Sequence, residues 1–209
     1  MSSENMQEKM IETIKAYGLD DEKVFRAMRK VKRHHFIPEY GFEDAYSDSA
    51  LPIEEDQTIS QPYTVAFMLH HLKLEEGNNV LEVGTGSGWS TAVIKEIVNS
   101  GNVTSVEYVH KLYDRAKRII SRLGYDICLV YGNGTLGYPK NSPYDRIIVA
   151  CAAPEIMDSW QEQLKDGGVI IAPVGGDYQV MVRGTKKGGV LRKENLGHFR
   201  FVPLKGYKK

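Results

Sequence analysis

A glycine-rich turn carries a clear chemical signal. Residues 82–88 read Glu-Val-Gly-Thr-Gly-Ser-Gly, directly after a short apolar run and before a segment with helical apolar spacing. Glycines at a strand-to-helix turn let the main chain bend tightly, and they let a ligand approach the backbone at the positive end of the helix dipole. The turn alone is weak evidence, because strand–helix junctions without a ligand also use glycine.

An acidic residue at the end of the next apolar run strengthens the prediction of a ligand. Glu107 lies 23 positions after Gly84, where a carboxylate can accept both hydroxyls of a ribose. This pair suits a dinucleotide and S-adenosylmethionine equally. Trp89 argues against the dinucleotide, because the pattern G-x-G-x-x-G needs its third glycine at that position. The E-x-G-x-G-x-G form instead resembles the first motif of Rossmann-like S-adenosylmethionine methyltransferases.

A second segment, upstream of the glycine turn, makes the prediction specific. It reads Ala50-Leu-Pro-Ile53, three acidic residues, and then Gln57-Thr-Ile-Ser60-Gln-Pro62. This segment strongly resembles the protein-L-isoaspartate O-methyltransferase family, and the resemblance covers nearly the whole chain from about residue 24. It continues through residues 80–88, 132–137, 144–149, 152–154, 163–168, 173–175 and 201–204. The glycine turn is common to many methyltransferases, whereas Thr58-Ile-Ser60-x-Pro62 is much more specific.

The resemblance implies a repair reaction on damaged proteins. A methyl group would pass from S-adenosylmethionine to the free α-carboxylate of L-isoaspartyl residues, giving a methyl ester and S-adenosylhomocysteine; activity on D-aspartyl residues is left open. A carboxylate with a pKa of ~4 is already ionised at pH 7, so no strong general base is required. The remaining task is to exclude water and to align the reacting atoms. Ser60 matches the family's active-site serine, and its alternative role is the N-cap of the helix that follows at Pro62.

The resemblance also assigns the other contacts. The cofactor would be bound by Thr58, Ile59, Gly84, Thr85, Gly86, Gly88, Glu107, Tyr108, Gly132 and Asn133. The peptide would be bound by Leu51, Pro52, Ile53, Val202, Pro203 and Leu204. No metal is expected, because the adjacent histidine pairs at 34–35 and 70–71 cannot easily share an ion and no other metal-ligand spacing occurs.

Two positions depart from the family. The family usually has Gly-Asp-Gly where this chain has Gly132-Asn133-Gly134, although an asparagine carbonyl can still accept a hydrogen bond from an adenine amino group. The family commonly has glycine where this chain has Asp56. Asp56 adds a third acid close to the expected substrate loop, and a solvated loop explains it equally well.

The elements that must position these residues alternate between strand and helix after Pro62. Strands are expected at 79–83, 103–106, 127–130, 146–150 and 169–174, and helices at 63–72, 89–98, 111–123 and 157–164. A turn is expected at Gly167-Gly168, before the strand at 169–174. A hairpin, with strands at 179–183 and from 190 onward, would follow, and then a last strand at 199–202. The pattern predicts an α/β fold, a Rossmann-like S-adenosylmethionine methyltransferase with a doubly wound, mostly parallel sheet and antiparallel C-terminal strands.

An N-terminal helical extension precedes this core. Apolar spacing predicts a helix from Met6 to Tyr17 and a second helix capped by Asp20, while residues 36–62 have no sustained period. We expect one methyltransferase domain over 1–209. Its parts would be an extension and substrate loop at 1–60, a cofactor-binding core at 61–175 and a β-rich part at 176–209.

Composition restricts the partners. The 209 residues include 27 Lys plus Arg and 27 Asp plus Glu. The net charge is therefore zero and would not attract the negatively charged phosphate backbone of a nucleic acid, so no nucleic-acid partner is expected. The sequence shows neither a signal peptide nor an apolar stretch of the ~18 residues that span a bilayer. The expected partners are damaged proteins or peptides that carry isoaspartyl residues, with no membrane and a cytoplasmic location; monomer or homo-oligomer is not decided.

Three other functions were weighed against methyl transfer to a carboxylate. A non-catalytic binding module is disfavoured by the intact glycine turn, Glu107 and Ser60. A nicotinamide oxidoreductase is disfavoured by Trp89 and by the absence of a Tyr-x-x-x-Lys motif near the fourth expected strand. Methylation of nucleic-acid bases would call for an Asn/Asp-Pro-Pro-Tyr/Phe motif after that strand, where the chain reads Ala152-Ala-Pro154.

Overall fold

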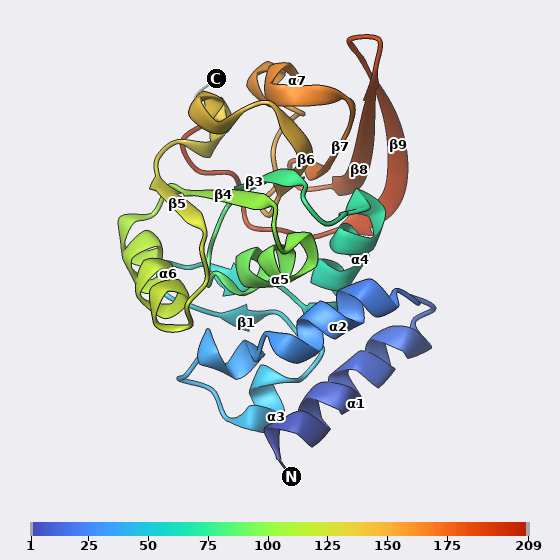
Figure 1. Cartoon of the computed structure of the whole chain (residues 1–209). Helices are drawn as coiled ribbons and strands as arrows, with labels where there is room; N and C mark the ends of the chain where they lie inside the picture. Colours follow the sequence, from blue (N-terminus) through green and yellow to red (C-terminus); the bar gives the residue numbers. More distant parts are fainter. Residues whose placement is uncertain (1, 208–209) are drawn as a thin grey trace.

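A seven-stranded sheet forms the centre of the structure, a computed structural model that describes residues 2–207 (Figure 1). Its strands are β3 (Asn79–Val83), β4 (Asn102–Glu107), β5 (Cys128–Tyr131), β6 (Tyr144–Val149), β7 (Leu164–Gly175), β8 (Gln179–Lys187) and β9 (Val190–Phe199). Their order is β5-β4-β3-β6-β7-β8-β9; β3 to β7 are parallel, and β8 and β9 are antiparallel. The predicted α/β, mostly parallel fold is confirmed.

Helices cover the two faces of the sheet unequally. They are α1 (Ser3–Ala16), α2 (Glu22–Lys30), α3 (Phe42–Ala45), α4 (Pro62–Leu72), α5 (Trp89–Val98), α6 (His110–Arg122) and α7 (Asp158–Gln163), with 3-10 turns η1 (Arg33–His35), η2 (Gly134–Leu136) and η3 (Pro139–Asn141). Figure 1 shows α4, α5 and α6 against one face with α1, α2 and α3 outside them, and α7 on the other side. No helix within residues 2–207 is long and apolar enough to cross a membrane.

The burial of each strand follows its place in the sheet. In the central strand β3, residues 80–83 are all buried, which is the pattern of a parallel strand covered on both faces. The edge strand β9 is mostly exposed and carries Arg192, Lys193 and Glu194. Charged side chains on an exposed edge discourage pairing with another chain.

Most predicted elements differ from the observed ones by a few residues at their ends, and three predictions were wrong in a larger way. Asp21, rather than Asp20, caps α2, because its carboxylate accepts a hydrogen bond from the Val24 amide at 3.2 Å. The pair Gly167-Gly168 lies inside β7, in an irregular stretch where the register against β6 shifts, so β7 begins directly after α7. No separate strand covers residues 199–202: β9 ends at Phe199, and the chain then makes one parallel bridge, from Pro203 to Ala152.

The segment expected to be irregular contains a small hairpin. The strands β1 (Leu51–Pro52) and β2 (Thr58–Ile59) pair antiparallel, and we call residues 51–59 the β1–β2 hairpin. Its turn has positive φ at Glu55 (61°) and at Asp56 (56°). Glycine adopts this backbone region at the lowest cost, so Asp56 occupies a conformation that favours glycine.

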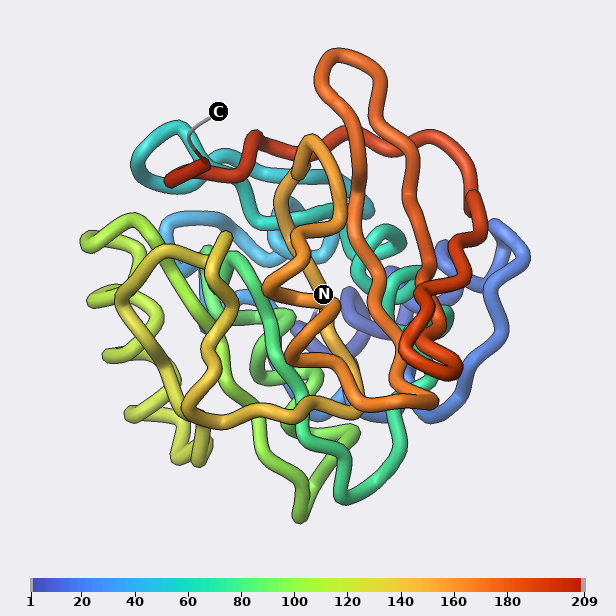
Figure 2. Tube along the Cα trace, turned by 90° about the horizontal axis from the view of Figure 1, so that it is seen from above, coloured from blue at the N-terminus to red at the C-terminus, as the bar shows by residue number. Residues whose placement is uncertain are grey.

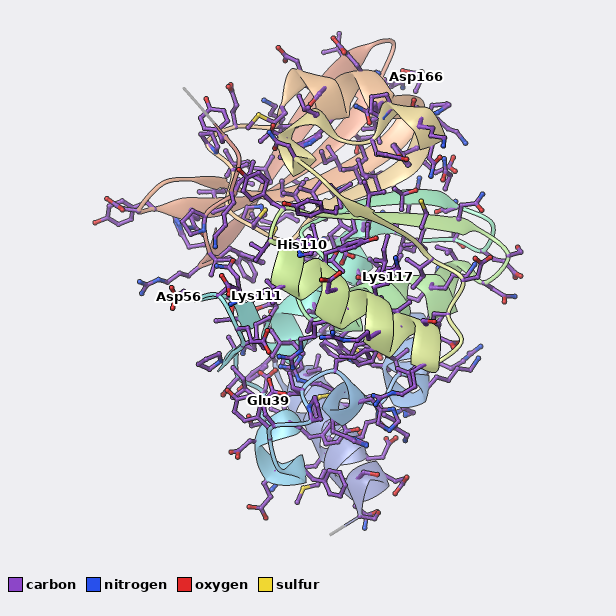
Figure 3. All side chains as sticks on the ribbon, turned by 90° about the vertical axis from the view of Figure 1, so that its left-hand side faces the viewer. Glu39, Asp56, His110, Lys111, Lys117 and Asp166 are labelled. Atoms are coloured by element: carbon purple, nitrogen blue, oxygen red, sulfur yellow. The ribbon has the colours of Figure 1, made fainter. Side chains whose placement is uncertain are left out.

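Ion pairs connect the β1–β2 hairpin to α6. Lys111 Nζ lies 2.5 Å from a Glu55 carboxylate oxygen, and Arg115 lies 3.7 Å from one of Glu54. Figure 3 shows Lys111 in the first turn of α6, next to the hairpin that carries Asp56. Two of the three consecutive acids therefore contact α6, rather than standing free for a substrate.

Candidate active site

A cavity of about 730 Å³ lies where the strand order reverses between β3 and β6. In open α/β sheets, ligands bind at this place, beyond the carboxyl ends of the strands. The glycine turn, the β1–β2 hairpin and residues 202–205 also line the cavity. Figure 2 shows the C-terminal segment (red) beside the cyan segment that contains the hairpin.

The glycine turn divides into a part that faces the cavity and a part that packs. Gly84, Thr85 and Gly86 line the cavity, and a Cβ added at Gly86 would meet no atom within 4 Å. Gly88 does not line it. At Gly88 φ is +86°, and an added Cβ would lie 3.1 Å from Cδ1 of Ile120. The third glycine therefore allows close packing of α5 against α6, and its contact with the cofactor remains a prediction.

Glu107 lies at the end of β4 and braces the turn. Its two carboxylate oxygens accept hydrogen bonds from the amides of Gly86 at 2.9 Å and Val109 at 2.8 Å. Each oxygen keeps a further lone pair for a ligand hydroxyl. Tyr108 lines the cavity beside it. The residues present therefore fit the expected cofactor: open space along a glycine backbone, with a carboxylate that can still accept two ribose hydroxyls.

A second carboxylate, that of Glu82, is fully buried beneath the turn. It accepts hydrogen bonds from the hydroxyls of Ser90 at 2.5 Å, Ser105 at 2.7 Å and Thr91. These donors belong to β4 and to the first turn of α5, so Glu82 joins three elements below the glycines. Burial raises the pKa of Glu82 above its ordinary value, against the opposing effect of the three hydroxyls. Sequence reasoning gave Glu82 no role beyond its place in the motif.

The raised pKa of Glu82 predicts a pH-dependent stability. The folded state retains a proton that the unfolded state releases above a pKa of about 4.3, so this stabilisation is complete below that pH and declines as pH rises, by at most about 1.4 kcal/mol per pH unit. Glu82→Gln does not titrate. We expect the unfolding free energy of the wild type, relative to E82Q, to fall between pH 4.5 and 7 in denaturant titrations. A constant difference would mean that Glu82 is ionised in both states.

The remaining walls of the cavity contain one further group that could act as a nucleophile, the thiol of Cys151. Cys151 is buried against the first residues after β3, and burial raises the pKa of its thiol to about 12. The thiol is therefore protonated at neutral pH and does not compete as a thiolate nucleophile. The charged side chains in the cavity lining are Glu107 and Lys205. Trp89, which argued against a dinucleotide, is almost fully buried, and its indole N–H donates to the Val31 carbonyl at 3.2 Å.

Gly132 and Asn133 do not line the cavity, whereas the next residue, Gly134, does. The Asn133 carbonyl oxygen accepts from the Thr135 amide at 3.0 Å and from the Thr135 hydroxyl at 2.8 Å, which caps η2. Its amide nitrogen donates to the Gly206 carbonyl at 3.1 Å. Asn133 thus connects η2 to the C-terminal segment, and its contact with an adenine remains a prediction.

A groove with about 1560 Å³ of empty space adjoins the cavity. The two share four lining residues, Thr58, Ser60, Ala150 and Val202, and we call this place the junction. Ser60 is half-buried there, and within residues 2–207 its hydroxyl makes no hydrogen bond. The alternative that Ser60 caps α4 is wrong: Gln61 is the N-cap residue, and the Asp48 carboxylate accepts from the Tyr63 amide at 2.7 Å.

The residues predicted to bind the peptide are separated in space. Val202 lies at the junction, while Pro203 and Leu204 line the cavity. Leu51 packs against the larger apolar cluster. Pro52 and Ile53 face a separate depression beside α6. Of the six, Val202 therefore borders the groove.

Other residues of the groove escaped sequence reasoning. They are Tyr17, Asp48, Ser49, Gln61, Tyr63, Thr64, His198, Phe199 and Arg200. Tyr17 and Tyr63 meet edge to face, with ring centroids 5.3 Å apart. Tyr17 ends a helix far upstream, so no local pattern connects it with Ser60. Within the described residues no group of three or more His, Cys, Asp or Glu side chains could hold a metal.

Comparisons with known proteins agree with this geometry. The profile of the family "Protein-L-isoaspartate(D-aspartate) O-methyltransferase (PCMT)" matches residues 4–209. The chain is similar to a protein-L-isoaspartate O-methyltransferase of Dictyoglomus turgidum, with 47% identity over 94% of this chain and 90% of the relative. Among solved structures, one protein-L-isoaspartate O-methyltransferase has a TM-score of 0.89 at 34% identity, covering 96% of this chain and 66% of that longer chain. A Plasmodium falciparum structure described as a protein of the same name, in complex with S-adenosyl-L-homocysteine, has a TM-score of 0.86 at 28% identity, covering 95% and 98%.

Proposed function

The chain belongs to the protein-L-isoaspartate(D-aspartate) O-methyltransferase family, and from that premise we propose how its site performs the reaction. It is an S-adenosylmethionine-dependent methyltransferase that acts on isoaspartyl residues in protein repair. The cofactor occupies the cavity, the damaged peptide lies in the groove, and the isoaspartyl α-carboxylate reaches the junction. Residues 1–209 act as one methyltransferase domain, since the C-terminal segment hydrogen-bonds back to Ala152.

The observation that carries this proposal is the junction itself. A site for methyl transfer needs two binding spaces that meet at one point, because donor and acceptor must approach to ~3–3.5 Å. The cavity and the groove meet at Ser60, and the Ser60 hydroxyl has no hydrogen-bond partner there within residues 2–207. Its proton is therefore available to a carboxylate.

The protein positions the reactants and does not activate a base. When bound, S-adenosylmethionine supplies an electrophilic methyl group on a sulfonium. Glu107 and the glycine backbone hold the cofactor, and the Ser60 O–H donates to the acceptor carboxylate, which orients that group without neutralising it. The isoaspartyl carboxylate is already ionised at neutral pH, so no proton has to be removed before transfer.

Methyl transfer with paired peptides tests the proposed function. The protein, supplied with S-adenosylmethionine tritiated on the methyl group, is expected to label a peptide that contains L-isoaspartate and to leave its L-aspartyl twin unlabelled. A methyl ester hydrolyses in alkali, so the label should then appear as volatile methanol. Equal labelling of both peptides, or label that survives alkali, would contradict carboxyl methylation of isoaspartate. A D-aspartyl peptide in the same series tests the second substrate class.

A further inference from the structure

Asp48 connects the start of α4 to the segment that precedes the β1–β2 hairpin. One carboxylate oxygen accepts from the Tyr63 amide at 2.7 Å, and the other accepts from the side-chain amide of Gln61 at 2.8 Å. Pro62, between them, has no amide proton to satisfy. A negative charge at the first turn of a helix is also favoured by the helix dipole. Asp48 therefore caps α4 although it lies 15 positions before Tyr63.

Ser60, the residue that faces the junction, is held by contacts on both of its sides in the sequence. Gln61 follows Ser60 directly, and it also accepts a hydrogen bond from the Thr64 hydroxyl at 3.1 Å. On the other side of Ser60, Ile59 pairs with Leu51 in the hairpin. The backbone of Ser60 is thus held between a strand pairing and the Asp48 contacts, while its hydroxyl has no partner among residues 2–207. The direction of that hydroxyl depends on both anchors.

Arg33 holds the segment that carries Asp48. Its side chain is fully buried, and it donates to the carbonyls of Ala45 at 2.8 Å and Ser49 at 3.3 Å, on the two sides of Asp48. Burial lowers the pKa of Arg33 to about 9, and the nearby charge of Asp48 opposes that shift, so Arg33 is cationic at neutral pH. Its guanidinium carbon lies 4.5 Å from the ring centroid of Trp89, the first residue of α5 after the glycine turn.

We propose that Asp48 is a positioning residue for the methyl transfer. Its carboxylate fixes the start of α4 and thereby the direction of the Ser60 hydroxyl at the junction. Arg33, whose guanidinium lies over the ring of Trp89, holds the segment that carries Asp48 at a fixed position relative to the cofactor cavity. Asp48 acts through Ser60 and does not itself contact the reacting atoms. This inference rests on the proposed function of the same site.

The test compares removal of Asp48 with removal of a similar cap elsewhere. Asp48→Ala loses both contacts, and we expect kcat to fall about 10- to 100-fold, because small misplacement of a reacting group has effects of this size. Cofactor affinity should change less than about twofold, since Asp48 does not line the cavity. Asp48→Asn keeps an acceptor for the Tyr63 amide and, after rotation of the Gln61 amide, both contacts; its kcat should stay within about threefold. Asp21→Ala, the control, removes the cap of α2 and a 2.9 Å contact with His70 in the last turn of α4, far from the start of that helix; it should lower thermal stability with kcat unchanged.

Two further variants separate positioning from stability. Asp48→Glu keeps the carboxylate but lengthens it by one methylene, so kcat should fall several-fold in a protein that still folds, even where Asp48→Ala does not. In a Ser60→Ala background, Asp48→Ala should lower kcat no further, because both changes act on one hydroxyl.

The outcomes of this experiment are distinct. An active wild type with unchanged kcat in both Asp48→Ala and Asp48→Glu would overturn the role of Asp48 and leave only a helix cap. Multiplicative losses in the double variant would also overturn it. A wild type that does not label isoaspartyl peptides at all would instead overturn the proposed function, whatever the Asp48 variants do.

Discussion

Ser60→Ala is expected to lower kcat about 100-fold while the dissociation constant of the cofactor changes less than about twofold, because losses of this size follow removal of one hydrogen-bond donor that orients a reacting group. The Ser60 hydroxyl lies at the junction of cavity and groove and makes no hydrogen bond within residues 2–207, so its removal disturbs no internal contact there. Only the orientation of the acceptor carboxylate is lost. Steady-state labelling at saturating isoaspartyl peptide measures kcat, and calorimetry with S-adenosylhomocysteine measures cofactor affinity.

Ser87→Ala is a matched control for Ser60→Ala. Ser87 also lines the cavity, but away from the junction, and its buried hydroxyl accepts a long hydrogen bond, 3.3 Å from the Trp89 amide. Its kcat should stay close to that of the wild type. If Ser60→Ala abolished cofactor binding together with turnover, Ser60 would be mainly structural, and the assignment of the acceptor to the junction would have to be abandoned.

Glu107→Ala is expected to weaken cofactor binding about 100-fold or more, since hydrogen bonds to a charged group contribute about 1.5–3 kcal/mol each and every 1.4 kcal/mol is a factor of ten. The variant loses two acceptors for the ribose, and it also leaves the amides of Gly86 and Val109 without their partner. The effect should appear in the dissociation constant of S-adenosylhomocysteine and in KM for the methyl donor.

The contrast with Ser60 lies in kcat. Glu107 does not line the groove, so kcat of Glu107→Ala at saturating cofactor should remain within about fivefold of the wild type, since the orienting donor is intact. Glu107→Gln, which keeps one acceptor oxygen and loses the charge, should fall between wild type and Glu107→Ala in affinity. Unchanged affinity in both variants would mean that the ribose binds elsewhere in the cavity.

The central parallel layer was predictable because its signals are local. β3 and α5 begin and end at the predicted residues, since an apolar run followed by glycines and then by helical spacing defines both of them. Glu107 could be assigned from its distance in sequence to Gly84, because the βαβ geometry brings the ends of neighbouring strands together. The fold and the cofactor part of the site could therefore be predicted from consecutive βαβ units.

The rest of the site depends on contacts between distant segments, for which no periodic signal exists. A sequence shows that Asp48 and Tyr63 are both present, but not that one caps the helix of the other. Tyr17 belongs to an outer helix, and only the packing of α1 against α4 brings it beside Tyr63 in the groove. Gly88 illustrates the same limit: its motif predicts a ligand contact, but it does not reveal that a positive φ and the nearness of Ile120 also require glycine there.

The connection from Trp89 through Arg33 and Asp48 to the start of α4 has a consequence for damage to the enzyme. The contacts that direct Ser60 come from Arg33 and Asp48, in the N-terminal part of the chain. Glu107 and the glycine turn are instead held by their own contacts, at the amides of Gly86 and Val109. Loss of the N-terminal contacts should therefore impair methyl transfer more than binding of the methyl donor, so a damaged enzyme would lose its activity without gaining other substrates.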